Sequence, residues 1–288
     1  MTDDPFVAHR GLLFTVAYEM LGSAADAEDV LQESWLRWAA VDRSGVRDPR
    51  AYLVRVVTRQ ALNRLRTVSR RREEYVGEWL PEPLLTGPDV AEDVELADSV
   101  SIAMLTVLET LGPTERAVFV LREVFDLPYD EIAEAIGKSA AATRQIARRA
   151  HQHVAARRPR ARVSRSEQQA VVERFMLALR TGRLQEQMDV MSPDVVLITD
   201  GGGIVSAARV PIHGAERIAG LLVRARRTVA AFEATPMSLN GAAASWIDMD
   251  GETAAISFAV QDGAITRIFA TRNPHKLTRL GRPVELAR

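Results

Sequence analysis

The sequence of 288 residues contains no cysteine, which excludes disulfides, thiolate metal ligands and cysteine nucleophiles. No stretch approaches the roughly 20 apolar residues of a membrane-spanning helix. The acidic start, MTDDPFVAHR, has no apolar run typical of a signal peptide. These absences predict a cytoplasmic protein without a membrane partner. The formal net charge is only −1, so any affinity for nucleic acid must come from segregated basic patches.

Lysine is also scarce, since only Lys138 and Lys276 are lysine among 37 basic residues. Arginine suits bidentate contacts with phosphates and bases. A GC-rich genome would give the same bias, so the arginine content alone does not assign a function.

Three blocks of the chain differ in pattern. Residues 6–72 and 98–158 repeat apolar residues every three or four positions, which predicts helices. Residues 73–97, between them, hold three prolines, two glycines and many acids, as a linker does. After about residue 168, a helical pattern is followed by short β-prone runs with the turn pairs NG, DG and DG near Gly241, Gly251 and Gly263. The last third is therefore predicted to be α+β, with a curved antiparallel sheet.

A helix-turn-helix is predicted within residues 127–160. Gly137 can take the left-handed conformation that ends a first helix, and Ser139 can cap a second. The row expected to face inward on the second helix is Ala142, Ile146 and Ala150. The outer row, which would supply donors to base edges and phosphates, is Arg144, Arg148 and His151. Nine basic residues and no acid between Lys138 and Arg165 favour DNA binding over a helical bundle with solvated arginines.

A second basic amphipathic helix is predicted over residues 50–66, where Asp48 can cap the helix and Pro49 fits its first turn. Its expected buried stripe is Leu53, Val57, Ala61 and Leu65. Its expected outer arginines are Arg55, Arg59 and Arg66. The nearby tryptophans, Trp35 and Trp38, could stack on unpaired bases, but a place in the core is the simpler interpretation.

Upstream, the run DAEDVLQESWLRW places acids between expected core positions. Those core positions are Ala27, Val30, Leu31 and Leu36. The acids would form a negative surface for a basic partner. Two basic helices on separate blocks indicate a protein that reads two DNA segments at a fixed spacing.

The segments DAEDVLQESWLRW, DPRAYLVRVVTRQALNRLR and LGPTERAVFVLREVFDLPYDEIAEAIGKSAAATRQIARRA strongly resemble bacterial RNA polymerase sigma factors of the extracytoplasmic-function type, over residues 6–158. The resemblance implies a sigma-2 domain over residues 1–72, which binds polymerase and opens the −10 element. It implies a linker over residues 73–97 and a sigma-4 helix-turn-helix domain over residues 98–160, which reads the −35 element. The implied partners are promoter DNA and core RNA polymerase, through the clamp helices of β′ and the flap of β. No cofactor is implied, and we expect a monomer.

The same resemblance implies roles for individual residues. Polymerase binding would involve Asp26, Asp29, Gln32 and Glu33. The −10 element would be contacted by Arg55, Arg59, Asn63 and Arg66. The −35 element would be contacted by Ser139, Arg144, Gln145, Arg148 and Arg149. Because residues 140–142 of the recognition helix are all alanine, the −35 sequence stays undetermined.

Residues 167–288 are similar to SnoaL-like domains, which are cone-shaped α+β folds with a pocket. One sigma-factor group carries this extension with a WLPEP linker, a DGGG stretch and a terminal NPDKL motif. Here these are residues 79–83, 200–203 and 273–277, the last reading NPHKL, with His275 in place of the acid.

The resemblance implies that this domain regulates the sigma factor in cis. The residues expected to form the interdomain surface are Trp79, Leu80, Pro81, Asp200, Gly201, Gly202, Gly203, Asn273, Pro274, His275, Lys276 and Leu277.

Two other functions remain open: a one-component regulator that senses a ligand and binds DNA, and an enzyme of the SnoaL type. Acid–base chemistry would need residues such as Asp200, His213, Asp248 or Asp250, and each fits a turn or surface position better. The run IDMDGE lacks the full spacing of a calcium loop, so no metal site is predicted. The acidic patch favours the sigma factor, because neither alternative needs it. We therefore expect a non-enzymatic sigma factor whose cone pocket leaves room for an unidentified small effector.

Overall fold

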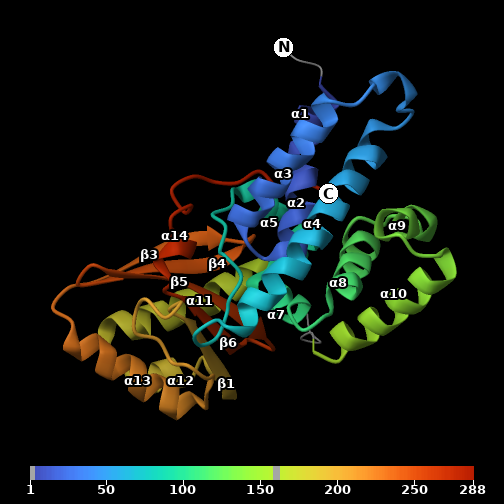
Figure 1. The fold of residues 1–288 in the computed structure, drawn as a ribbon. Helices are drawn as coiled ribbons and strands as arrows, with labels where there is room; N and C mark the ends of the chain where they lie inside the picture. The colour runs from blue at the N-terminus through green and yellow to red at the C-terminus, as the bar shows by residue number, and fades with distance from the viewer. Residues whose placement is uncertain (1–3, 158–162) are drawn as a thin grey trace.

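The computed structural model describes residues 4–157 and 163–288, except for the side chains of residues 69–73 and 91. Figure 1 shows the helices of the N-terminal half beside a six-stranded sheet, whose own helices α11, α12 and α13 cover one of its faces. The other face of the sheet receives the linker and α7, through a small core of Leu80, Ile102, Ala259 and Phe269. The end of the basic run, at residues 158–162, lies outside the described residues.

The first helical block, residues 6–72, is built around a long helix. Its elements are α1 (Pro5–Ala8), α2 (Arg10–Leu21), α3 (Ala24–Ala39) and α4 (Pro49–Glu73). Asp48 Oδ1 accepts a hydrogen bond from Ala51 N at 3.0 Å, so the predicted cap of α4 is confirmed. The predicted stripe of α4 is also confirmed, because Leu53, Val57, Ala61 and Leu65 are all buried.

One core prediction for α3 was wrong. Leu36 is 62% exposed, whereas Trp38 is buried. The indole nitrogen of Trp38 donates a hydrogen bond to Asp4 Oδ1 at 3.0 Å, which satisfies the buried donor. Trp38, two positions further along the helix, therefore faces the core and Leu36 faces outward.

The second helical block, residues 98–158, contains the predicted helix-turn-helix. Its elements, with those at the end of the linker, are α5 (Pro88–Glu92), α6 (Val94–Val100), α7 (Ile102–Leu108), α8 (Pro113–Phe119), a π-helical turn (Val120–Val124), α9 (Tyr129–Ile136) and α10 (Ala140–Ala155). Gly137 ends α9 with φ 68°, and Ser139 Oγ accepts from Ala142 N at 3.2 Å at the start of α10. The turn and the cap are therefore confirmed.

The predicted inner row of α10 was only partly right. Ala150 is buried, but Ala142 and Ile146 are half-buried. The residues that face inward are Thr143, Ala147, Ala150 and Val154. A buried stripe follows 3.6 residues per turn and mixes steps of three and four, so a row of fourfold steps drifts off it.

The two helical blocks share one hydrophobic core. It extends from Phe6 to Val154 and includes Leu84 of the linker and Leu286 near the C-terminus. The predicted domain boundaries remain predictions. In this conformation, however, the blocks cannot part without exposing apolar side chains from both.

In the C-terminal domain, residues 167–288, helices precede the first strand as predicted, but a further helix, α13, interrupts the strands after β2. Its elements are α11 (Arg165–Thr181), α12 (Leu184–Met188), β1 (Met191–Asp200), β2 (Ile212–His213), α13 (Ala215–Thr228), β3 (Phe232–Leu239), β4 (Ala242–Met249), β5 (Glu252–Gln261), β6 (Ala264–Thr271) and α14 (Pro274–Leu277). The three predicted hairpin turns connect β3 to β4, β4 to β5 and β5 to β6. Both residues of each turn pair have positive φ, as a type I′ turn requires.

The sheet is mixed rather than wholly antiparallel, with the strand order β2-β1-β6-β5-β4-β3. Strand β1 runs parallel to β6, and the other neighbouring strands are antiparallel. Because α13 and three hairpins separate β1 from β6, no tight turn imposes antiparallel pairing on them.

Within residues 4–157 and 163–288, no helix is both long enough and apolar enough to cross a membrane.

The tip of the β3–β4 hairpin is buried against the helical blocks, which gives a test of the docking. Gly241 has φ 74°, and a Cβ there would lie 2.7 Å from Ala97 Cβ. Gly263 has the same φ at the half-buried tip of the β5–β6 hairpin, where a Cβ would meet nothing closer than 3.8 Å.

We predict that both Gly263→Ala and Gly241→Ala lose about 1–2 kcal/mol of unfolding free energy from the left-handed backbone. Gly241→Ala should lose about 1–3 kcal/mol more from overpacking. Chemical denaturation measures both values, and equal losses would show that the buried tip contributes nothing.

Candidate nucleic-acid interface and interdomain site

The predicted −35 surface on α10 is open to solvent. Arg144, Gln145, Arg148 and Arg149 are all exposed. Arg149 Nε lies 3.5 Å from Glu115 Oε1, which is a loose ion pair on the surface. The outer face of the helix can therefore meet DNA in this conformation.

The predicted −10 surface on α4 is partly covered. Arg55 forms an ion pair with Glu134 of α9. Arg59 donates to the carbonyl oxygens of Glu134 at 2.8 Å and Ala135 at 3.3 Å. Asn63 and Arg66, further along α4, are exposed. Of the four side chains expected to contact the −10 element, two are therefore bound by the helix-turn-helix.

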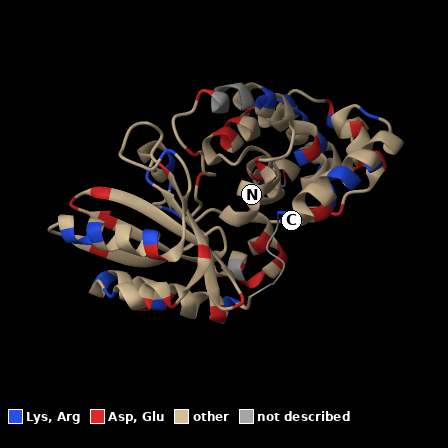
Figure 2. Ribbon diagram, turned by 90° about the horizontal axis from the view of Figure 1, so that it is seen from below, with Lys and Arg blue, Asp and Glu red and all other residues tan. Residues whose placement is uncertain are grey.

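The predicted polymerase-binding acids lie on α3, and two of them already have a partner. Arg64 of α4 donates to Asp26 at 2.8 Å and to Asp29 at 3.0 Å, whereas Gln32 and Glu33 are exposed. Figure 2 shows basic and acidic residues close together over the helical part of the molecule, in line with such ion pairs. Sequence reasoning missed Arg64, because α4 carries several arginines and the sequence does not show which of them pairs with an acid of α3.

The predicted interdomain residues meet around the carboxylate of Asp200, at the end of β1, which is fully buried. Asp200 Oδ1 accepts from Tyr75 Oη at 2.6 Å and Gly202 N at 3.1 Å. Asp200 Oδ2 accepts from Leu80 N at 2.9 Å and Lys276 Nζ at 2.7 Å. Four donors satisfy both oxygens of an ionised carboxylate. We call Asp200, Gly202, Asn273, Lys276, Tyr75 and Leu80 the Asp200 cluster.

Lys276 and Asn273 attach the last motif to the linker. Lys276 Nζ also donates to the Leu80 carbonyl and lies 3.9 Å from the ring centroid of Trp79. Asn273 Nδ2 donates to Tyr75 Oη at 2.7 Å. Leu80, Pro81 and Leu277 are buried beside these contacts, whereas Pro274 and His275 are exposed. The side chain of His275 therefore faces solvent, and its backbone N–H donates to Asn273 Oδ1 at 3.1 Å.

The DGGG stretch forms a tight loop against this cluster. Gly202 has φ 63°, and a Cβ there would lie 2.3 Å from Asn273 Nδ2. Gly201 and Gly203 lie in the same loop, next to Val205 and Val76 respectively. The side chain of Asn273 can pack against residue 202 only because glycine has no side chain there.

Asn240, at the tip of the β3–β4 hairpin, is a second interdomain contact that sequence reasoning missed. Its Nδ2 donates to Tyr18 Oη at 2.7 Å and to the Val100 carbonyl at 2.9 Å, and its Oδ1 accepts from Leu84 N at 2.9 Å. One buried amide therefore joins the first helical block, the linker and the second helical block.

Glu82 of the WLPEP motif fixes the linker to the first helical block. Its Oε2 accepts from Ala24 N at 2.8 Å and Ser23 Oγ at 3.2 Å, at the N-terminus of α3. Burial raises the pKa of Glu82, and these hydrogen bonds oppose that rise. A charge at a helix N-terminus is favourable, so the linker acid acts as an external cap.

Glu19 of α2 is a buried acid between the helical blocks. Ser99 Oγ of α6 donates to Glu19 Oε1 at 2.7 Å, and Arg116 Nε of α8 donates to the Glu19 carbonyl at 2.9 Å. Burial raises the pKa of Glu19 to about 8, and burial also lowers the pKa of Arg116 to about 9. Two helices of the second block therefore contact Glu19, α6 through its carboxyl group and α8 through its backbone carbonyl.

Two of the candidate acid–base residues, Asp248 and Asp250, bind backbone groups at turns. Asp250 accepts backbone hydrogen bonds from Ala230 and Ala231, and Asp248 accepts one from Gly251, so both stabilise turns. His213 is exposed on the short edge strand β2. Among the residues that the structure describes, no group of three acids or histidines could hold a metal ion.

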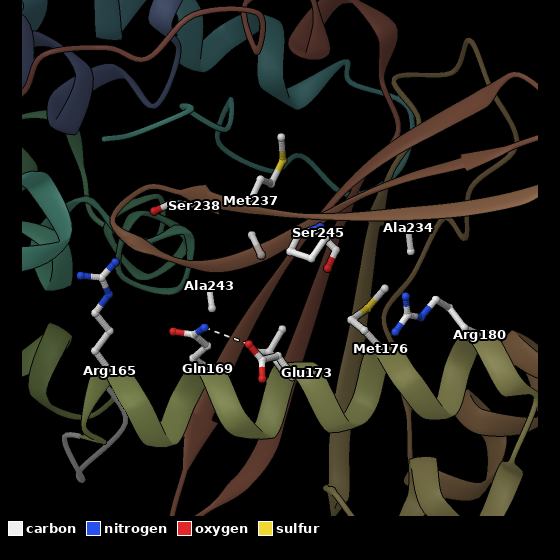
Figure 3. Close-up of a pocket in the computed structure, with 13 residues that line it drawn as sticks. Arg165, Gln169, Glu173, Met176, Arg180, Ala234, Met237, Ser238, Ala243 and Ser245 are labelled. Carbon is white, nitrogen blue, oxygen red and sulfur yellow. Dashed lines mark hydrogen bonds between the residues drawn. The ribbon is translucent and has the colours of Figure 1, made fainter. Parts of the chain in front are cut away.

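Two hollows lie beside α11. Figure 3 shows a groove between α11 and strands β3 and β4, with Arg165 and Arg180 towards its two ends and Glu173 between them. Gln169 Nε2 donates to Glu173 Oε1 at 2.8 Å within the groove. A second, largely apolar cavity of about 370 Å³ lies between the sheet and helices α11 and α13.

Known proteins resemble this chain in sequence and in structure. Residues 6–71 match the family model of Sigma-70 region 2, and residues 101–154 match that of Sigma-70, region 4. The ECF RNA polymerase sigma factor SigJ of Mycobacterium tuberculosis is 36% identical, over 95% of this chain and 92% of that protein. A second sigma factor of that organism, SigI, is 31% identical over 94% of this chain and 92% of its own length. The crystal structure of SigJ is similar with a TM-score of 0.78 and 33% identity, covering 96% of this chain and 98% of that one.

The Asp200–Lys276 ion pair gives the next prediction. Asp200→Asn removes the charge opposite Lys276 and turns one acceptor oxygen into a donor. Removing one partner of a buried pair costs about 3–5 kcal/mol of unfolding free energy. The double variant with Lys276→Met should recover part of that loss. Thermal unfolding measures the cycle, with Asp194→Asn on the surface as the control, and an additive double variant would show that the pair is not coupled.

The raised pKa of Glu19 predicts a pH dependence of stability. At a pH between the ordinary pKa of a glutamate and about 8, Glu19 is protonated in the folded chain and ionised in the unfolded chain. The resulting contribution to stability is complete below that ordinary pKa and is lost as pH rises towards about 8.

Glu19→Gln should therefore flatten the pH profile of the unfolding free energy over this interval, whereas Glu131→Gln on the surface should leave it unchanged. Denaturant unfolding at a series of pH values measures the slope. An unchanged slope in Glu19→Gln would contradict the assignment.

Proposed function

Because the chain belongs to the extracytoplasmic-function family of RNA polymerase sigma factors, we propose that the conformation described above is its resting form, held closed by its own C-terminal domain. A sigma factor binds core RNA polymerase and promoter DNA and directs transcription initiation. Residues 55–66 and α10 supply its proposed −10 and −35 contacts, and the acids of α3 its polymerase contact. Its site of action is then the cytoplasm, with the polymerase.

The contact between α4 and α9 is the observation that carries this proposal. A sigma factor must present its −10 and −35 surfaces to two separated DNA segments at once. Here the side chains of Arg55 and Arg59 are engaged by Glu134 and Ala135 of α9. The shared core of the two helical blocks also opposes their separation. Promoter opening then requires α9 to leave α4.

The C-terminal domain supports the closed form from the opposite side. Asn240 contacts both helical blocks and the linker, and the Asp200 cluster contacts the linker. Because the domain is tethered, these contacts act at a high effective concentration and need little intrinsic affinity. We infer that core polymerase competes with this arrangement for the first helical block.

The C-terminal domain serves regulation in this proposal rather than catalysis. None of Asp200, His213, Asp248 and Asp250 lines the apolar cavity. An acid–base mechanism needs such groups within reach of a bound substrate. The cavity is therefore assigned to an effector.

Reconstituted transcription with core polymerase and a promoter library tests the proposal. Glu134→Ala removes the ion pair with Arg55 and leaves the proposed DNA-binding residues intact. We expect initiation to rise by up to about fivefold, because an exposed ion pair contributes up to about 1 kcal/mol. Glu131→Ala, on the same helix, should leave initiation unchanged.

Equal initiation by both variants and the unchanged chain would sink the autoinhibited form. A full chain that binds duplex DNA tightly alone, but never polymerase, would favour the one-component regulator instead.

A further inference from the structure

The apolar cavity of the C-terminal domain has an unusual charge balance. Its walls come from α11, α13 and the inner face of the sheet, and include Phe175, Leu179, Leu222, Ile247 and Ile268. Two arginines, Arg226 and Arg272, also line it, and no acidic residue does. Its volume of about 370 Å³ lies in the range of small-ligand sites. An apolar ligand with a negative group fits such a lining, and a cation does not.

Both arginines have a buried polar atom without a partner. The Nε atoms of Arg226 and Arg272 are buried and make no hydrogen bond within the part of the chain that the structure describes. The remainder of Arg272 is fixed, since its terminal nitrogens bind the Ser206 carbonyl and Glu252. Arg226 lies over the ring of Phe232, 5.1 Å from the guanidinium carbon to the ring centroid. An unpaired buried donor is costly, and a ligand acceptor would remove that cost.

The groove of Figure 3 is a weaker candidate for the same ligand. Glu173 lies between its two arginines and would repel an anion. Met176 lines both hollows, so they adjoin each other through one flexible side chain. Glu252, the partner of Arg272, does not line the cavity, whereas Glu173 lines the groove, so an anion fits the cavity better.

We propose that this cavity binds an apolar monocarboxylate, whose carboxylate accepts hydrogen bonds from Arg226 and from the free Nε of Arg272. Guanidinium groups bind carboxylates side-on through Nε and a terminal nitrogen, and such charge-assisted bonds are the strong ones. The apolar remainder of the ligand fills the space between the sheet and α11.

The walls of the cavity are continuous with the Asp200 cluster. Thr199 precedes Asp200, and Arg272 precedes Asn273. Arg272 N donates to the Asp200 carbonyl at 2.7 Å, and Thr199 Oγ1 accepts from Ala208 N at 2.8 Å. The strand ends that form the cavity walls therefore also carry residues of the Asp200 cluster.

A ligand that fits the cavity as formed here stabilises this conformation over any other. This step rests on the proposed function, in which the present conformation is the closed one. The apolar monocarboxylate then acts as a negative effector that lowers initiation.

Calorimetric titration of the full chain tests the site, with decanoate as the probe and 1-decanol and decylamine as its neutral and cationic counterparts. We expect decanoate to bind and the other two to bind at least tenfold more weakly. Arg226→Gln should weaken decanoate binding by roughly tenfold to a hundredfold, the range for hydrogen bonds to a charged group. Arg224→Gln, two residues away and exposed, is the matched control and should bind as the unchanged chain does.

A second variant guards against misfolding of the first. Ala225→Leu narrows the cavity from α13 without changing charge and should also abolish decanoate binding. Equal binding of decanoate and 1-decanol, or unchanged binding in Arg226→Gln, would overturn carboxylate recognition. Absence of decanoate binding to the unchanged chain would overturn the site altogether.

The effector role is tested by adding decanoate to the reconstituted transcription. Initiation should fall for the unchanged chain and for Arg224→Gln, but not for Arg226→Gln. Decanoate that binds without changing initiation would overturn the effector role. Failure of Glu134→Ala to raise initiation, with decanoate binding intact, would instead sink the autoinhibited form and leave the site in place.

Discussion

The arrangement of the whole molecule depends on the buried carboxylate of Asp200. A fully buried charge is tolerated only when it is paired and hydrogen-bonded. Asp200 obtains its donors from three separate places: the linker, the DGGG loop and α14. If the linker moves away, Tyr75 and Leu80 leave together and the carboxylate loses half of its donors. The cluster therefore favours a fully docked or a fully released linker over intermediate positions.

The linker is the element through which the two ends of the molecule are joined. Glu82 caps α3, Leu84 donates to Asn240 and Leu80 donates to Asp200, all within five residues. The C-terminal segment also binds the linker and α2. Val284 N donates to the Leu85 carbonyl, and Ala287 N donates to Thr15 Oγ1. Figure 1 shows this segment running from α14 back to the N-terminal helices. These contacts form a continuous chain of packed groups between the linker, the N-terminal helices and the C-terminal domain.

Local features of the fold could be predicted because their causes are local. The cap at Asp48 and the left-handed Gly137 depend on residues within one helical turn, and the stripe of α4 depends on the periodicity of one helix. The motif residues of the Asp200 cluster could be predicted only through the family resemblance, since DGGG alone fits a flexible turn. Asn240 shows why the rest could not. The pair Asn240–Gly241 has the same turn chemistry as the pair Asp262–Gly263, yet the first pair is buried between domains and the second is only partly covered. Periodicity and turn type specify the element and not its distant partner.

The energetics of the closed form follow from many contacts of modest strength. The ion pair of Arg55 with Glu134 is exposed and contributes little alone. The Asn240 amide and the Asp200 cluster are buried, so their loss leaves unpaired groups, which is the expensive outcome. Tethering removes most of the association cost, and the balance between closed and open forms can then lie within a few kcal/mol. A difference of about 1.4 kcal/mol changes that balance tenfold. In the proposed function, core polymerase and the proposed carboxylate ligand would therefore shift the same equilibrium in opposite directions.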